Sequence, residues 1–458
     1  MNLKLFPLLL LALAGCRQTT AAQEAQKDMI VAPTPETKRE TVLSRYLSRP
    51  EAAYKWQAVT DGEFTGGDLN LRLTSQTWQG APWTHRLQIF KPDNVRFPDA
   101  ALLNISFGSG SMPETFIGKA LANATGVTVV NVFNVPNQPL FERTEDELIA
   151  YTLGKYLETG DETWPLLLPM TKSVTKTMDA LGEWSQKQGG AKISRFIVTG
   201  ASKRGWTTDL VAASDKRVIG AIPLVYNNLD MPSQIAHQKQ IWKETSPMIA
   251  PYADAGLFDQ MQTEAGQKLI GIIDPYQYRA ALTMPKLLIN ATNDAYWPLD
   301  SLKFYRANLP GQTDLFNVPN APHSLGENIT AAIGSAAAWS RLVLEGKTAP
   351  KIDLKVTNTT IGRTFSASVQ GEGRTVRLWF ASSPTLDFRR ATWKSIELPA
   401  QDGIYRAHVD NKVLYAQGKQ AQAFAEIEIA AQPLPLRLSS DVWQGAQIEV
   451  RTMTIPRG

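Results

Sequence analysis

Short apolar segments alternate with helical ones through the middle of this 458-residue chain, and this alternation limits its fold most strongly. Apolar runs at 101–105 and 127–132 are followed by amphipathic segments near 145–158 and 171–187. Strands that are apolar on both faces need helices on both faces, so the pattern predicts an α/β fold with a mostly parallel sheet. Further strands of this kind are expected at 194–199, 218–225, 286–291 and 314–318.

Weaker patterns surround these strands. Segments 69–73 and 85–90 alternate apolar and polar residues, which predicts antiparallel strands at a sheet edge. The stretch 228–284 has few strand signals and several helical ones, and it is too long for a simple connection. We therefore expect a helical cap over about 228–284, within an α/β domain that covers 43–346.

The period of the pattern changes to two in the last hundred residues. Short alternating strands in 351–458 are separated by Gly, Pro and Asp turns, about one strand every dozen residues. This pattern predicts a small C-terminal β-sandwich of immunoglobulin or fibronectin type. The boundary falls in the Lys-Thr-Ala-Pro segment 347–350.

The N-terminus has the features of a bacterial lipoprotein signal. An apolar run follows Lys4 and is too short to span a bilayer, and Leu-Ala-Gly-Cys at 13–16 resembles a lipobox. We expect cleavage after residue 15, lipidation of Cys16 and a flexible tether over 16–42. The chain would then be membrane-anchored in the bacterial cell envelope, with outer-membrane sorting favoured by Arg17. A plain secretory signal, or a buried thiol at Cys16, is the alternative.

Composition excludes several classes of function. The 47 basic and 43 acidic residues are scattered, without the basic stripe that a nucleic-acid partner requires. Cys16 is the only cysteine, so an intramolecular disulfide, a cysteine-based metal site and a cysteine nucleophile elsewhere are excluded. The four histidines offer no pair at helical spacing, and we therefore predict neither a metal nor a cofactor.

The strongest local motif is the segment 196–206, in which an apolar strand runs into Gly-Ala-Ser and then into a helix. Ser202 is thus placed as in a nucleophile elbow, where a tight turn projects the hydroxyl toward the helix N-terminus. The motif departs from Gly-x-Ser-x-Gly, because Gly205 lies three residues after Ser202 and Arg204 takes the usual glycine position. An ordinary serine between a strand and a helix is the alternative.

A serine nucleophile needs a base, and the histidines differ in their context. His323 lies in a proline-rich loop after the strand at 314–318, whereas His85, His237 and His408 are expected to be packing or surface residues. Asp294 follows the strand at 286–291, which places an acid at the same kind of position.

The chain order Ser202, Asp294, His323 is that of the α/β-hydrolases. In this triad, Ser202 attacks an acyl carbon, His323 accepts its proton and Asp294 orients the imidazole. Asp300 is the rival acid, although we expect it to cap the following helix.

An oxyanion hole must accompany such a triad. The amide N–H of Lys203 is one predicted donor, and the glycine loop at 107–111 supplies the other through Gly108 or Ser109. A simple turn is the alternative for this loop. A phosphate-binding loop fits less well, because Lys and Ser/Thr do not follow the glycines as that motif requires.

Longer motifs resemble the PhoPQ-activated pathogenicity-related protein family, a branch of the α/β-hydrolases. They include Thr-Trp-Pro at 163–165, Gly-Ala-Ser-Lys-Arg-Gly-Trp at 200–206, and the segments 135–140, 145–152, 273–276 and that around Asp294. The resemblance covers about 45–345 and implies a secreted or surface hydrolase fold with the triad above, but no substrate. The elbow is also similar to that of glucuronoyl esterases, which implies that the Lys203 side chain assists the oxyanion hole. Exposure of Lys203 to solvent is the alternative.

Other residues are weaker candidates for the substrate cleft. Trp164, Trp206 and Trp297 are predicted to line it, with burial in the core as the alternative for each. Lys172, Glu145 and Asp146 fit a cleft and a solvated helix face equally well.

These features together predict an envelope-anchored serine hydrolase that cleaves an ester or amide through an acyl-enzyme intermediate. Its substrate would be a small-molecule or peptide acyl compound. The alternatives are a peptidase of the same fold and a non-catalytic binding lipoprotein on a hydrolase scaffold.

Overall fold

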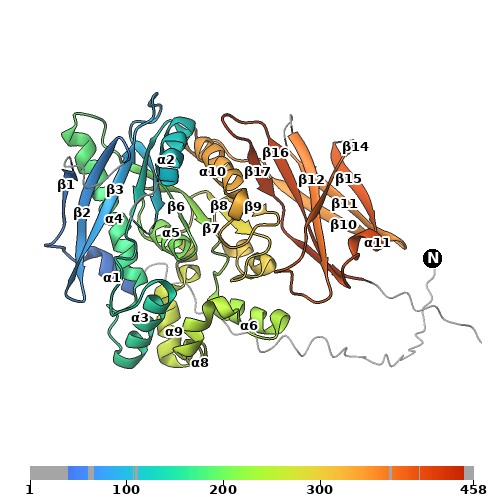
Figure 1. Ribbon diagram of the computed structural model, residues 1–458, viewed down its shortest axis with the longest axis horizontal. Coiled ribbons are helices and arrows are strands. Elements are labelled where there is room, and N and C mark those ends of the chain that lie inside the picture. Colours follow the sequence, from blue (N-terminus) through green and yellow to red (C-terminus); the bar gives the residue numbers. More distant parts are fainter. Residues whose placement is uncertain are drawn as a thin grey trace, which may run out of the picture. The chain divides into compact units, whose positions relative to one another are not determined.

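The computed structural model describes residues 40–59, 66–106, 108, 112–370, 374–401 and 403–447 (Figure 1). The predicted signal peptide, Cys16, most of the predicted tether and Ser109 lie outside these residues. The described residues all belong to one compact unit that starts at residue 35. Within the described ranges, no helix combines the length and the apolar character that a membrane span requires.

A large mixed sheet forms the centre of this unit. Its strand order is β1-β2-β3-β5-β4-β6-β7-β8-β9, and all pairs from β5 through β4 to β9 are parallel. The first strands pair antiparallel and make one edge of the sheet, as the alternation at 69–73 and 85–90 predicts. The bounds are β1 Lys55–Val59, β2 Leu69–Trp78, β3 Ala81–Phe90, β4 Ala100–Ile105, β5 Thr128–Val132, β6 Arg195–Ala201, β7 Val218–Leu224, β8 Lys286–Ala291 and β9 Thr313–Val318.

Helices cover both faces of the sheet. On one face α2 packs against β5 and α10, and α10 packs against β7, β8 and β9; on the other, α4 and α5 contact each other and the strands beneath them (Figure 1). This two-sided cover explains why β8 is buried along its whole length. The helices are α1 Val42–Ser48, α2 Met112–Thr125, α3 Glu145–Thr159, α4 Leu167–Lys187, α5 Lys203–Ser214 and α10 Ile329–Leu344.

A helical insertion separates β7 from β8, which confirms the predicted cap. The Asp274 carboxylate accepts hydrogen bonds from the backbone N–H of Met231, at 2.9 Å, and from that of Tyr276, at 3.0 Å. One buried side chain therefore joins the beginning of the insertion to its end. The insertion consists of α6 Met231–Trp242, η1 Pro247–Ile249, α7 Ala250–Asp254, α8 Leu257–Gln260, α9 Glu264–Ile273 and η2 Pro275–Ala281, and the short turns η3 Leu299–Phe304, η4 Arg306–Asn308 and η5 Gly326–Asn328 follow later in the chain.

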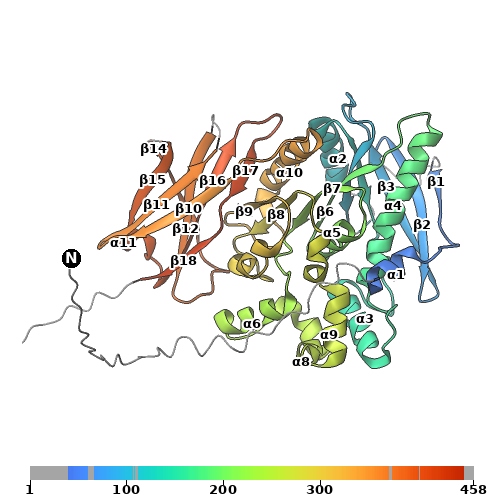
Figure 2. The ribbon, with the colours of Figure 1, turned by 180° about the vertical axis from the view of Figure 1, so that it is seen from behind.

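Two antiparallel sheets follow α10, so the predicted fold class, an α/β-hydrolase fold with a cap and a C-terminal β-sandwich, is confirmed (Figure 2). One sheet has the order β10-β11-β15-β14 and the other β13-β12-β16-β17, with β18 paired to β16. The sandwich shares a hydrophobic core with the large sheet through Phe316, Trp339 and Leu436. Its elements are β10 Ile352–Asn358, β11 Gly362–Val369, β12 Arg374–Ser383, β13 Lys394–Glu397, β14 Ala400–Gln401, β15 Ile404–Asp410, α11 Asn411–Leu414, β16 Gln420–Ile429, β17 Leu436–Ser439 and β18 Trp443–Ala446.

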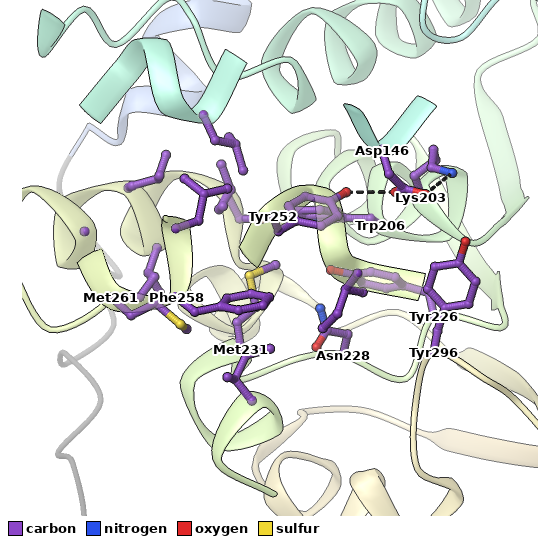
Figure 3. A pocket seen from close by; sticks show the side chains of 18 of the residues that line it. Asp146, Lys203, Trp206, Tyr226, Asn228, Met231, Tyr252, Phe258, Met261 and Tyr296 are labelled. Carbon is purple, nitrogen blue, oxygen red and sulfur yellow. Dashed lines mark hydrogen bonds and ion pairs between the residues drawn. The ribbon is translucent and has the colours of Figure 1, made fainter. Parts of the chain in front are cut away.

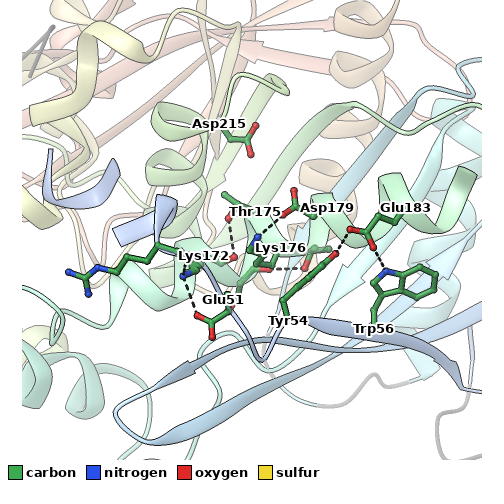
Figure 4. A network of polar contacts seen from close by, with 12 residues as sticks. Glu51, Tyr54, Trp56, Lys172, Thr175, Lys176, Asp179, Glu183 and Asp215 are labelled. Carbon is green, nitrogen blue, oxygen red and sulfur yellow. Dashed lines mark hydrogen bonds and ion pairs between the residues drawn. The ribbon is translucent and has the colours of Figure 1, made fainter. Parts of the chain in front are cut away.

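Polar contacts attach the first residues of the fold to helix α4 (Figure 4). Glu183 accepts hydrogen bonds from the Trp56 indole, at 2.7 Å, and from the Tyr54 hydroxyl, at 3.1 Å. Lys172 is buried and pairs with Glu51 at 3.2 Å. Lys172 therefore belongs to this attachment and not to a substrate cleft or a solvated helix face.

Helix α5 carries a buried carboxyl group whose ionisation is coupled to folding. The pKa of Asp209 is raised to about 8, mainly by burial; Lys286 lowers this pKa in part and the nearby Asp274 adds to the rise. Its Oδ2 atom has no hydrogen-bond partner among the described residues. Because an unfolded Asp titrates near pH 3.8, the folded state binds the extra proton between these two pKa values, and stability falls as pH rises through this interval.

We predict that Asp209→Asn removes this pH dependence, since the amide keeps the shape of the side chain and cannot ionise. Between pH 5.5 and 8.5 the wild-type free energy of unfolding should fall relative to the variant by more than about 1 kcal/mol, the equivalent of one pKa unit. Urea unfolding at several pH values measures this, with the exposed Asp259→Asn as control. Parallel pH curves for wild type and Asp209→Asn would contradict the prediction.

Candidate active site

Ser202 lies on a sharp turn between β6 and α5. Its backbone has φ 57° and ψ −123°, a conformation that costs a non-glycine residue energy and is typical of a nucleophile elbow. A Cβ atom on Gly200 would lie 2.7 Å from the carbonyl oxygen of Arg204, and one on Gly205 would lie 2.8 Å from the Cβ of Tyr226. The glycine three residues after the serine is thus needed because the chain beyond β7 passes close to α5.

Asp294 and His323 lie together on the loops that follow β8 and β9. The His323 Nδ1 atom is 2.9 Å and 2.8 Å from the two carboxylate oxygens of Asp294. The Asp294 carboxylate is buried and also accepts a hydrogen bond from the Tyr296 N–H at 2.7 Å. The Tyr296 ring lies 4.0 Å from the imidazole, centroid to centroid, which fixes the plane of the histidine.

The other imidazole nitrogen, His323 Nε2, is buried and has no hydrogen-bond partner among the described residues. No hydrogen bond joins it to Ser202 within these residues. Catalytic hydrogen bonds are often long before substrate binds, so this geometry is compatible with a base that acts only in the loaded enzyme. Nε2 is therefore the imidazole atom left available for proton transfer.

The remaining histidines have other partners. His85 is buried and contacts Ser75 at 2.9 Å, and burial lowers its pKa to about 4. His237 contacts Asp300 at 2.9 Å, and Asp300 also pairs with Lys303. The expected helix-capping role of Asp300 is wrong, because it lies inside η3, after the cap residue Pro298, and its carboxylate is turned toward His237.

Two acidic residues at the start of α3 meet the two basic residues of the elbow. Lys203 Nζ lies 2.9 Å from a Glu145 oxygen and 3.0 Å from an Asp146 oxygen. Arg204 makes two bonds of 2.6 Å to Glu145 and one of 2.7 Å to the carbonyl of Val135. The Lys203 side chain is buried, and its charge is neutralised beside Ser202 instead of pointing to solvent.

A pocket opens beside Ser202, underneath the helical cap (Figure 3). Its space measures about 820 Å³ and includes open solvent at its mouth, and Lys203, Trp206 and Trp297 are among its lining residues. Trp206 stacks on Tyr226, with ring centroids 5.6 Å apart. Other residues also line this pocket although no sequence pattern points to them: Tyr226, Asn228, Tyr252 and Tyr296.

Two predicted site residues, Trp164 and Gly108, are not among the lining residues of the pocket. Trp164 packs in an aromatic cluster with Trp78 and Tyr151 and does not line the pocket, so its placement in the cleft is corrected. Gly108 is exposed, with φ 78°, and the next residue, Ser109, lies outside the described part of the chain.

Within the described residues, no group of three His, Cys, Asp or Glu side chains is arranged to hold a metal ion.

The C-terminal region contacts the loops that carry Asp294 and His323. Asn293 donates hydrogen bonds to backbone carbonyls in the segment 388–391, the shortest being 2.7 Å to Ala391. Asn320 and the backbone of Trp393 exchange two hydrogen bonds, of 3.0 Å and 2.8 Å. Both loops are thus held by the same stretch of chain.

A model of the PhoPQ-activated pathogenicity-related protein family matches residues 43–389 of the chain. The chain belongs to this family. The resemblance inferred from the sequence motifs is therefore confirmed. Autocrine proliferation repressor protein A of Dictyostelium discoideum is 33% identical over 341 residues, which cover 69% of this chain and 68% of that protein.

Solved structures with a similar fold include two acetyl xylan esterases and a glucuronoyl esterase. The enzyme from Paenibacillus sp. R4 is 13% identical, with a TM-score of 0.45 over 66% of this chain and 96% of its own. The enzyme from Thermoanaerobacterium sp. is 15% identical, with a TM-score of 0.46 over 66% and 92%. The Sporotrichum thermophile glucuronoyl esterase is 14% identical, with a TM-score of 0.41 over 67% and 81%.

We predict that Glu145→Gln destabilises the protein at neutral pH, because Arg204 and Lys203 are buried and lose a full negative charge. Burial opposes ionisation of Glu145, yet Arg204 and Lys203 lower its pKa to about 2. The expected loss is about 1–2 kcal/mol, reduced because a third of the Glu145 side chain is exposed.

The pH dependence of this effect has a definite sign. A carboxylate with a lowered pKa stabilises the fold above its unfolded value of 4.5, and this contribution is lost as pH falls toward 2. The free energies of unfolding of wild type and Glu145→Gln, measured in urea, should therefore differ at pH 7 and converge toward pH 3. Exposed Glu147→Gln on the same helix is the matched control. An equal loss at pH 7 in both variants would reject a specific role for the ion pairs.

Proposed function

We propose that the protein is a serine hydrolase that cleaves an ester or amide through Ser202, His323 and Asp294. The observation that supports this most is the Asp294–His323 pair, at 2.8 Å, on loops that follow neighbouring strands of the sheet. Ser202, on a strained turn after β6, lies at the same end of these parallel strands and lines a pocket. The sheet thus supplies all three groups at its carboxyl edge.

In the proposed reaction, Nε2 of His323 accepts the Ser202 proton as the hydroxyl oxygen attacks the acyl carbon. Asp294 keeps the other nitrogen, Nδ1, protonated and stabilises the imidazolium. The imidazolium then donates its proton to the leaving alcohol or amine, and an acyl group remains on Ser202. A water molecule, deprotonated by His323, releases the acid in the second half of the reaction.

Negative charge on the tetrahedral intermediate requires donors in fixed positions. Lys203 is the first residue of α5, and its backbone N–H is the first proposed donor. The helix dipole also favours an anion at this position. The second donor is assigned to the loop at Gly108 or Ser109. Glu145 and Asp146 hold the Lys203 ammonium group and balance its charge. The Lys203 side chain therefore acts on the intermediate as part of this fixed group of charges, which moves little during the reaction.

The two alternative functions differ in what they require of this site. A peptidase would use the same three residues on an amide bond, and its distinction from an esterase depends on the leaving group. A non-catalytic binding protein would need only the pocket. The pairing of the buried Asp294 carboxylate with His323 favours turnover, because burial of a carboxylate costs free energy that a binding role does not require.

We predict that Ser202→Ala abolishes both labelling by a fluorophosphonate probe and hydrolysis of p-nitrophenyl acetate, with unchanged circular dichroism. Asp294→Asn should lower kcat/KM by about 10³-fold or more, because the amide favours the wrong imidazole tautomer. Asp300→Asn is the matched control, since Asp300 contacts His237, and kcat/KM should change by less than about tenfold.

Two results would contradict this mechanism. Full activity of purified Ser202→Ala would reject the serine nucleophile. A larger loss in Asp300→Asn than in Asp294→Asn would reject the assignment of the acid.

We further propose that the hydrolase is anchored in the cell envelope by lipid on Cys16, with the chain after Cys16 as its tether. We predict that Cys16→Ser releases the protein from membranes or blocks its maturation, because the lipid supplies the anchor. Membrane fractionation and mass spectrometry of the mature N-terminus measure this. A mature chain that starts at another residue without lipid would reject the proposal.

A further inference from the structure

The pocket beside Ser202 is apolar over most of its wall. Its hydrocarbon and thioether side chains come from α3 and from the helical insertion, which are both outside the large sheet. Several of them, such as Ile249 and Ile270, are almost fully buried. The apolar lining residues are Leu153, Leu157, Met231, Ile235, Ile249, Leu257, Phe258, Met261, Leu269, Ile270 and Ile273.

Most polar groups of this pocket gather at one end, and Asn228 lies nearer the middle, beside Met231. Figure 3 shows Asp146, Lys203 and Tyr296 on one side and Phe258 and Met261 on the other. The polar groups bond to one another: the Tyr252 hydroxyl donates to Asp146 at 2.9 Å, and Lys203 pairs with Asp146 at 3.0 Å. The far end offers hydrocarbon and thioether surface in place of hydrogen-bond partners.

We propose that the substrate carries an apolar hydrocarbon group next to the scissile bond, and that this group is bound under the cap. The inference rests on the proposed hydrolase function, because it uses Ser202 to orient the substrate in the pocket. A sugar or a charged group at the far end would lose water without new hydrogen bonds, which is unfavourable. Each buried methylene instead improves binding by roughly fourfold.

Two ester series test on which side of the scissile bond the apolar group lies. p-Nitrophenyl acetate, butyrate, hexanoate and octanoate vary the acyl group, and ethyl, butyl and hexyl acetate vary the alcohol. We expect kcat/KM to rise by about tenfold or more along one of the two series. The series that rises identifies the acyl or the alcohol side as the one held by the pocket.

Substitutions at the far end test whether the cap provides this preference. Met261 is partly buried and lines the far end, so Met261→Trp should fill it and lower the ratio of octanoate to acetate turnover at least tenfold, or the hexyl to ethyl ratio if the alcohol series rises. Met248→Trp is the matched control, because Met248 lies in the same insertion, is 43% exposed and does not line the pocket. It should leave the ratio unchanged.

A binding measurement separates this proposal from the hydrolase function. Octanamide and acetamide are titrated calorimetrically into Ser202→Ala, with and without Met261→Trp. Saturable binding of octanamide that Met261→Trp removes supports the apolar site even if no ester is turned over, in which case only the hydrolase function fails.

The opposite results are equally informative. Turnover of the acetates without a rise in either series, together with no octanamide binding, overturns the apolar site and leaves the hydrolase function intact. Absence of turnover, of probe labelling and of octanamide binding overturns both.

Discussion

The parallel pairing of β6, β7, β8 and β9 is the constraint on which the rest of the site depends. Parallel neighbours end at the same edge, so residues far apart in the chain meet when each follows one of these strands. Ser202 follows β6, Asp294 follows β8 and His323 follows β9. The strained backbone of Ser202 is held in place because Gly200 and Gly205 let α5 and the end of β7 approach it closely.

The sheet holds the loops after β8 and β9 only where they leave the strands, and hydrogen bonds to the C-terminal region hold them further out. Asn293 precedes the proposed acid, Asp294, and Asn320 lies three residues before the proposed base, His323. Both asparagines bond to backbone groups between residues 388 and 393. Asn320 also donates its backbone N–H to Thr292, which ties the two loops together. The C-terminal region therefore holds both loops that carry the proposed acid and base.

Local patterns were enough to predict the elements of this site from the sequence. The elbow around Ser202 and the positions of Asp294 and His323 after apolar strands depend on short-range features, and the α/β pattern predicts a mostly parallel sheet whose strands end at one edge. The Asp294–His323 contact is one that these patterns predict.

Features that depend on long-range approach were not predictable in this way. Glu145 and Asp146 look like ordinary acidic residues in the first turn of a helix, where the dipole favours them. Their contacts with Lys203 and Arg204 exist because the first turn of α3 lies beside the elbow. From the sequence, both residues fit a cleft and a solvated helix face equally well. The sequence also could not show that Trp164 packs against Trp78 and Tyr151, because a tryptophan suits an aromatic cluster as well as a cleft. The domain boundary at 346–351 stays a prediction, and the hydrophobic core is continuous across it.

In the proposed hydrolase, the reacting groups and the substrate-binding wall lie on different parts of the fold. The groups proposed to react lie on the sheet, where neighbouring strands restrict their positions on both sides. The apolar wall of the pocket comes largely from an insertion between β7 and β8, whose ends are joined by the Asp274 carboxylate. Substitutions in the insertion can therefore change which hydrocarbon group is accepted while β6, β8 and β9 keep the reacting groups in register. The same division explains why the motifs around Ser202 led to a proposed reaction type, whereas the sequence of the cap had no recognisable pattern from which a substrate could be inferred.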